Sequence, residues 1–295
     1  MTPRFLLVLI VLALTGCGAP ALPPRGAESP LAYDRADVAR APKLAILVPG
    51  AFASGSIFAP AGTWRDAGYA LVYYRLPGLD GLPLDHALRI ETAADTIAEF
   101  ARQHPDKKIR LFGYSAGGPI VIEAARRLEG RDIRAAALAP SPDHAGGIRT
   151  TLRGTLDLIG AARRAGTFDR DAVWEEYYRV LLFGRAGLAD PELAELSRRI
   201  AAEQRGKILV PDREMARAHT RDLRQWRLEP VPDWLQPRVR IYLGREDPIF
   251  SLDQTLAVAQ KAGDGGVYAY PRQGHLMFLT GPRVFDDVLA FFESP

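Results

Sequence analysis

The chain has 295 residues, of which 47% are hydrophobic and 25% are charged; these ordinary globular values exclude a chain that is disordered along most of its length. The formal net charge is only +3, and the basic residues are scattered among acidic ones, so no charge run indicates a nucleic-acid partner. The single cysteine excludes a disulfide within one chain, and the sequence has no Cys/His cluster that would indicate a metal site.

Residues 1–16 have the pattern of an export signal. Arg4 precedes a short apolar run, residues 5–14, that is too short to span a bilayer comfortably. The run ends in Leu14-Thr15-Gly16-Cys17, which resembles the lipobox of bacterial lipoproteins, a family in which the cysteine is acylated and begins the mature protein. The resemblance implies a lipid anchor on Cys17 in the bacterial cell envelope, and Gly18 in place of Asp favours the outer membrane. An ordinary signal with an incidental cysteine is the alternative.

The next segment, residues 17–42, begins as a stretch rich in proline and alanine. Such composition favours an extended, semi-rigid tether over a packed element. We expect this tether to hold the folded part of the protein away from the membrane surface.

Six short apolar runs follow, separated by turns and helical patterns. Because they lack polar alternation, they are typical of strands buried on both faces, and their alternation with helices predicts a mostly parallel α/β sheet of about six strands. Its ligand site is expected beyond the carboxyl ends of the strands. The six runs are 43–48, 69–74, 109–112, 133–138, 239–243 and 266–270.

Residues 143–235 interrupt this order with several helical patterns, which we interpret as a helical cap inserted into a core formed by residues 43–142 and 236–295. Asp190-Pro191 is typical of a helix start. Trp174, Tyr178 and Leu181 are spaced to share one helix face. This face either lines a pocket for an apolar substrate or packs the cap against the core.

Gly113-Tyr114-Ser115-Ala116-Gly117 lies between the strand pattern 109–112 and the helical pattern 119–128. A G-x-S-x-G sequence in that context is typical of a nucleophile elbow, in which flanking glycines permit a sharp turn that presents the serine hydroxyl. A serine hydroxyl is a weak nucleophile at neutral pH and needs an imidazole to take its proton. Ser115 is therefore a candidate nucleophile that requires a histidine partner.

Two further motifs, one with an acid and one with a histidine, each follow a predicted strand. With the elbow they give the chain order serine, acid, histidine. Asp247 lies in Gly-Arg-Glu-Asp-Pro, and His275 lies in Gly-His-Leu-Met-Phe. Together with the elbow, these motifs resemble the α/β-hydrolase superfamily over roughly residues 43–293. Asp143, and less favourably Asp253, are alternative acids, whereas the other histidines are interpreted as solvated or structural; these are His86, His104, His144 and His219.

The resemblance implies two backbone donors for a developing oxyanion, the N–H groups of Ala116 and Ala51. Two positions depart from the family pattern. Pro49 stands where the family more often has histidine, so the hydrogen bonds that support this loop must differ. Tyr114 also stands where histidine is frequent, which places an aromatic ring behind the serine.

The family resemblance implies a serine hydrolase that cleaves a small-molecule or lipid-like carboxylic ester or thioester through an acyl-enzyme, without a metal or cofactor. Two alternatives remain open. One is an envelope binding or assembly protein that retains the fold without turnover. The other is a non-hydrolytic member of the superfamily, such as a haloperoxidase-like enzyme or a lyase.

Overall fold

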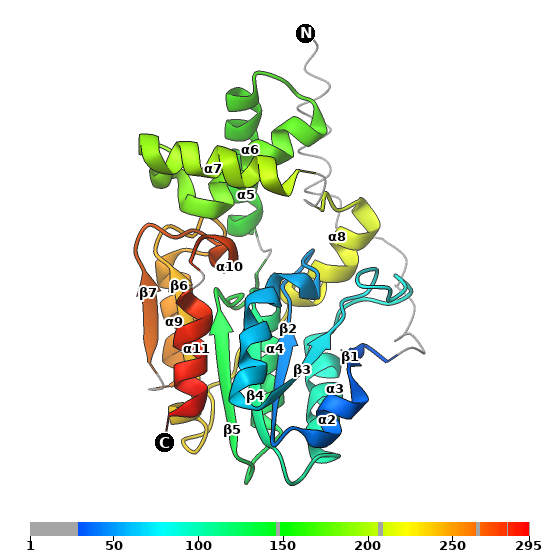
Figure 1. Cartoon of the computed structure of the whole chain (residues 1–295). Helices are drawn as coiled ribbons and strands as arrows, with labels where there is room; N and C mark the ends of the chain where they lie inside the picture. Colours follow the sequence, from blue (N-terminus) through cyan, green and yellow to red (C-terminus); the bar gives the residue numbers. More distant parts are fainter. Residues whose placement is uncertain (1–28, 146–147, 206–208, 264–265, 282, 295) are drawn as a thin grey trace.

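The fold is built on a seven-stranded sheet with the order β1-β3-β2-β4-β5-β6-β7, in which only β1 is antiparallel to its neighbour (Figure 1). The computed structural model describes residues 29–145, 148–205, 209–263, 266–281 and 283–294. The strands are β1 (Leu31–Tyr33), β2 (Lys43–Val48), β3 (Tyr69–Tyr74), β4 (Lys108–Tyr114), β5 (Ile133–Leu138), β6 (Val239–Gly244) and β7 (Val267–Tyr270). The predicted α/β class is thus confirmed, and the six predicted runs correspond to β2–β7.

The seventh strand, β1, corrects the expectation of about six strands and of a tether that continues to residue 42. Leu31 is buried in the core, and β1 pairs with β3 through the register Leu31↔Tyr74. The helix α2 (Arg35–Arg40) follows at once, capped by Asp34, which accepts a hydrogen bond from the Asp37 N–H at 2.9 Å. Three residues are too few to show a strand pattern in sequence. The export signal, Cys17 and the rest of the tether lie outside the described residues.

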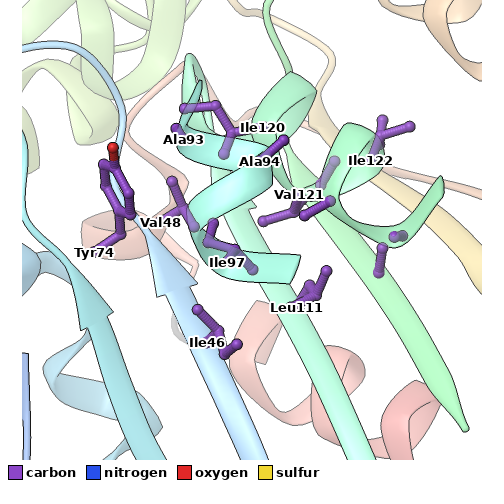
Figure 2. Packing of buried hydrophobic residues seen from close by; sticks show 14 of the residues in the cluster. Ile46, Val48, Tyr74, Ala93, Ala94, Ile97, Leu111, Ile120, Val121 and Ile122 are labelled. Carbon is purple, nitrogen blue, oxygen red and sulfur yellow. The ribbon is translucent and has the colours of Figure 1, made fainter. Parts of the chain in front are cut away.

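The strands β2–β6 are buried on both faces, whereas the edge strand β7 is largely exposed. Alternate residues of β2 contact different clusters: Ile46 and Val48 belong to one, and Ala45 and Leu47 to the other. Figure 2 shows side chains of α3 (Ile90–Arg102) and α4 (Gly117–Arg126) gathered around Ile46 and Val48. The opposite face is covered by η1 (Gly55–Ala67) and α11 (Arg283–Glu293). Burial on both faces explains why β2–β6 lack polar alternation. The same expectation is wrong for β7, which lies at the edge of the sheet and is largely exposed.

In the described part of the chain, four α-helices lie between β5 and β6: α5 (Ile148–Ala165), α6 (Arg170–Gly187), α7 (Pro191–Gln204) and α8 (Arg213–Thr220). Figure 1 shows α5, α6 and α7 grouped beyond one end of the sheet. The predicted helix start at Asp190 is confirmed, because its carboxylate accepts hydrogen bonds from the N–H groups of Glu192 and Leu193. No helix in the described part of the chain is long and apolar enough to cross a membrane.

The predicted aromatic face of α6 divides between two contacts. Tyr178 and Leu181 pack against the core cluster on the α11 face of the sheet. Trp174 instead donates its indole N–H to the carbonyl of Leu209 at 3.1 Å. Two of the three side chains therefore pack α6 against the core. The remaining short elements are α9 (Leu252–Ala262), α10 (Met277–Thr280), η2 (Asp222–Arg224) and η3 (Gln236–Arg238).

Candidate active site

Ser115 lies at the sharp turn between β4 and α4, with a φ of 50°. A left-handed backbone is strained for a serine; it is held here by a hydrogen bond from the Ser115 N–H to the Leu138 carbonyl at 2.9 Å. The glycines on either side are sterically required. A Cβ on Gly113 would lie 2.1 Å from the Gly117 oxygen, and one on Gly117 would lie 2.1 Å from the Val48 oxygen.

The structure brings Ser115, His275 and Asp247 together in one hydrogen-bonded line. The His275 Nε2 lies 3.1 Å from the Ser115 Oγ, and the His275 Nδ1 lies 2.7 Å from the Asp247 Oδ2. All three side chains are buried. Because the carboxylate can only accept, the Nδ1–H donates to it, and Nε2 is left to accept the serine hydroxyl proton. This arrangement can move a proton from the serine to the imidazole.

The carboxylate of Asp247 is fixed by its own loop. Its Oδ1 accepts hydrogen bonds from the N–H groups of Ile249 at 2.8 Å and Phe250 at 3.0 Å. The Phe250 ring also lies 5.3 Å, centroid to centroid, from the His275 ring. Asp247 is therefore oriented toward His275 by backbone donors on one oxygen, with the other oxygen directed at the imidazole.

A kink in α6 supports both loops that carry these side chains. At Gly184 the backbone leaves the helical conformation, with φ 70° and ψ 179°. Near this break, the carbonyls of Leu181 and Leu182 accept hydrogen bonds from the His275 N–H at 2.7 Å and the Gly274 N–H at 2.8 Å. On the Asp247 side, a Cβ on Gly184 would lie 2.3 Å from the Glu246 oxygen. The kink thus contacts the histidine loop and the acid loop.

Gly184→Ala should therefore lower both stability and activity. The observed φ and ψ are essentially restricted to glycine, and such strain costs on the order of 1–3 kcal/mol, while the clash with Glu246 would displace the Asp247 loop. Gly154→Ala is the matched control, because Gly154 lies within α5 and a Cβ added there would meet no atom within 4 Å; it should raise the free energy of unfolding by about 0.5–1 kcal/mol. Urea unfolding of both variants checks these opposite signs, and equal stabilities would contradict the role of the kink.

The two segments expected to supply oxyanion donors both lie beside Ser115. Ala116 is the N-cap residue of α4, where the first N–H groups of a helix have no partner within it. Gly50 lies against the nucleophile, since a Cβ there would be 2.7 Å from the Ser115 Cβ. The Ala53 N–H donates to the Gly50 carbonyl at 3.0 Å, so residues 50–53 form a tight turn at this position.

Tyr114 lies behind the site as an apolar ring. Its centroid is 5.2 Å from that of His275 and 5.1 Å from that of Phe278. Burial, with a smaller contribution from the negative charge of Asp247, raises the pKa of the Tyr114 hydroxyl well above its usual value. The phenol therefore stays neutral, and its ring contributes packing beside the imidazole.

His275 is hydrogen-bonded to Asp247, and neither alternative acid takes that place. Asp143 forms an ion pair with Lys261 and accepts a hydrogen bond from the Leu228 N–H at 2.9 Å. Asp253 is exposed in the first turn of α9. Three of the other histidines also have partners of their own: His86 lies 2.5 Å from an oxygen of Asp85, His104 packs on Phe100, and His144 contacts Arg227.

His219, which the sequence predicts to be solvated or structural, contacts the loop beside Ser115. It is completely buried on α8, where its Nδ1 accepts a hydrogen bond from the Phe52 N–H at 3.1 Å and its Nε2 lies 2.7 Å from the Pro77 carbonyl. No local pattern around His219 signals these contacts. The only indication in the sequence is indirect: with Pro49 in place of histidine, the neighbouring loop needs another support.

Stability should fall in mild acid because of His219. Burial lowers its pKa below the ordinary value, and the hydrogen bond to Pro77 offsets only part of this effect. As the pH falls through about 6.5, the pKa of histidine in the unfolded chain, the unfolded chain takes up a proton before the folded protein does. The free energy of unfolding therefore decreases below that pH. Melting temperatures of the parent and His219→Asn between pH 8 and 5 check this. The parent should lose more than the variant; parallel curves would contradict it.

The part of the chain that the structure describes holds no group of three or more His, Cys, Asp or Glu side chains arranged to bind a metal ion.

Comparison with known proteins agrees with this fold. No curated protein matches the sequence. Solved structures that resemble the chain include a non-heme bromoperoxidase candidate of Mycobacterium tuberculosis, with 17% identity, a TM-score of 0.68 and 93% and 98% of the two chains covered. The enol-lactonase of Burkholderia xenovorans has 15% identity, a TM-score of 0.64 and coverage of 90% and 95%. An esterase of Thermogutta terrifontis has 17% identity, a TM-score of 0.60 and coverage of 88% and 92%.

These identities are low, so the likeness concerns the fold alone. The sequence itself gives the family. The model of the alpha/beta hydrolase family matches residues 45–288. This range includes the elbow at Ser115, the motifs that contain Asp247 and His275, and the helices between β5 and β6. The chain therefore belongs to the alpha/beta hydrolase family.

Proposed function

We propose that the protein is a serine hydrolase that cleaves a carboxylic ester or thioester through an acyl-enzyme intermediate. The observation that carries this proposal is the unbroken hydrogen-bonded line from the Ser115 hydroxyl through His275 to Asp247. In this assignment Ser115 is the nucleophile, His275 the general base and then acid, and Asp247 the group that orients the imidazole.

The proposed reaction has an acylation stage and a deacylation stage. The Ser115 Oγ attacks the acyl carbon while the His275 Nε2 takes its proton, and the same nitrogen then returns the proton to the leaving alcohol or thiol. Water then attacks the acyl-enzyme while the His275 Nε2 takes its proton. The same nitrogen returns this proton to the Ser115 Oγ as the acid is released. In this proposal the N–H groups of Ala51 and Ala116 donate hydrogen bonds to the negatively charged oxygen of the tetrahedral intermediates. They stabilise this charge effectively because they are in position before the reaction begins.

The substrate class is a small-molecule or lipid-like ester. The esterase and enol-lactonase that share the fold support an acyl substrate in general, and residues 14–17 support a location in which membrane-derived esters are accessible. An apolar acyl group is the expected specificity. Rates that fall steeply as the acyl chain lengthens would contradict it.

A serine-directed fluorophosphonate probe tests the reaction class. The purified protein and Ser115→Ala are treated with the probe, and both are assayed on 4-nitrophenyl esters of increasing acyl length. Labelling of the parent alone, together with turnover, supports the hydrolase. No labelling of a folded parent contradicts it and favours an envelope binding protein, whereas labelling without turnover of esters or thioesters favours a non-hydrolytic member of the family.

The cell location is a separate part of the proposal. Leu14-Thr15-Gly16-Cys17 supports acylation of Cys17 and anchoring in the cell envelope, with the outer membrane as the expected membrane. Stable anchoring requires more than one acyl chain.

Cys17→Ser should therefore abolish incorporation of labelled palmitate and move the protein from the membrane fraction to the soluble fraction after cell lysis. Metabolic labelling and fractionation of a bacterial host check this result. The Ser115→Ala variant serves as the control, because it should stay with the membranes. Unchanged fractionation of the Cys17 variant would favour an ordinary export signal.

A further inference from the structure

The loop that carries Ala51 contains a strained residue. Phe52 has a φ of 67°, a left-handed conformation that bulky side chains rarely adopt unless their surroundings impose it. The loop turns tightly here, because the Ala53 N–H donates to the Gly50 carbonyl at 3.0 Å. The structure must therefore contain an interaction that maintains this backbone beside the nucleophile.

His219 supplies two contacts to Phe52. Its Nδ1 accepts a hydrogen bond from the Phe52 N–H at 3.1 Å. Its ring also stacks on the Phe52 ring, with centroids 5.4 Å apart and an interplanar angle of 14°. The hydrogen bond fixes the plane of the peptide between Ala51 and Phe52, and the stacking fixes the side chain that follows it.

His219 is itself firmly held. Its Nε2–H donates to the Pro77 carbonyl at 2.7 Å, which leaves Nδ1 unprotonated and able to accept. Two further hydrogen bonds attach its surroundings to the core: the Leu88 N–H donates to the Ala218 carbonyl at 2.9 Å, and the Ile90 N–H donates to Asp222 at 2.8 Å. The acceptor that meets Phe52 thus comes from a fixed position on α8.

We infer that His219 is a positioning residue that holds residues 50–53 in the conformation that presents the Ala51 N–H to the oxyanion. It acts through Phe52 and does not touch the reacting atoms. The side chain that supports this loop thus comes from α8, between β5 and β6, and not from the loop itself. The inference rests on the proposed function, because it assigns a role to the same oxyanion site.

Two variants separate the hydrogen bonds of His219. In His219→Asn, the Oδ1 can stand at the position of Nδ1 and still accept from the Phe52 N–H. In His219→Gln, the Nε2 amide can stand near the position of the histidine Nε2 and still donate to Pro77, but nothing accepts from Phe52. Both variants lose the ring, so the difference between them reports the bond to Phe52.

For 4-nitrophenyl ester hydrolysis, kcat of His219→Gln should fall by about 10²-fold or more, the usual loss of one oxyanion donor. His219→Asn should stay within about fivefold of the parent, since its acceptor is retained. KM should change little in either variant, because the loss is confined to the transition state. The rate of fluorophosphonate labelling should fall in parallel with kcat. Equal losses in both variants, or losses that appear in KM alone, would overturn the inference.

A third variant keeps the test decisive where the Asn variant folds poorly. Glycine adopts a positive φ without strain, so Phe52→Gly removes the need for an imposed conformation. His219→Gln should then lower kcat less in the Phe52→Gly background than in the parent. Equal fold losses in the two backgrounds, at comparable melting temperatures, would contradict the positioning role. A parent protein without turnover would instead contradict the proposed function, so the two failures are distinguishable.

Discussion

Alanine at either Ser115 or His275 should lower kcat for ester hydrolysis by about 10⁶-fold, and the variant with both changes should be no slower than either single one. The reason is that the two side chains act as one unit across the 3.1 Å contact between Oγ and Nε2. Without the imidazole the hydroxyl keeps its proton, and without the hydroxyl the imidazole has no nucleophile to activate. Steady-state kinetics with a 4-nitrophenyl ester measures all three variants.

Losses that multiply in the double variant would mean that the two residues act independently, which contradicts a shared proton transfer. Residual turnover is also informative. Backbone donors and substrate binding still act when the triad is absent, so about 10³–10⁴-fold acceleration over water should persist. Melting temperatures close to that of the parent are required as a control, because both residues are buried.

The position of the three side chains could be predicted from sequence because each lies at or just after a strand of a parallel sheet. The carboxyl ends of parallel strands meet at one edge, so Ser115 after β4 and Asp247 after β6 come together whatever the detailed helix packing. Glycine at positions 113 and 117 is a further reliable signal, since any side chain there would overlap backbone atoms.

The support around these side chains could not be predicted, because it comes from residues distant in the chain. Phe52 and His219 are 167 positions apart, and nothing local to either indicates their contact. Gly184 is equally hidden. A glycine inside a helical pattern is weakly informative. The requirement for glycine at this position follows only from the three-dimensional structure, in which the Glu246 backbone lies too close for a Cβ.

The edge of the sheet could not be predicted for a different reason. β1 has three residues and α2 has six, lengths at which neither strand alternation nor helical periodicity is distinguishable from chance. The composition of the segment before them favours a tether, and nothing in the sequence marks where the tether ends. What decides the local structure is the partner strand β3, which offers Leu31 a buried position.

Asp247→Asn should lower kcat by about 10⁴-fold with little change in fold, since the shape of the side chain is kept. The carboxylate accepts hydrogen bonds from Ile249, Phe250 and the His275 Nδ1–H at once, whereas an amide has only one accepting oxygen. If the amide oxygen faces the backbone donors, its NH₂ group faces Nδ1, which then loses its proton; Nε2 becomes protonated and cannot accept from Ser115.

Asp143→Asn is the matched control, because Asp143 is the alternative acid in the sequence and its carboxylate contacts Lys261 and the Leu228 N–H. Its variant retains an acceptor for Leu228 and should keep kcat within about twofold, with at most a small loss of stability from a partly exposed ion pair. The Asp247 variant should regain rate at high pH, where hydroxide assists removal of the serine proton, whereas the Asp143 variant should follow the parent profile. A large loss of kcat in Asp143→Asn, with kcat retained in Asp247→Asn, would mean that Asp143 orients His275 during catalysis. The acid would then come from the loop after β5 and not from the loop after β6.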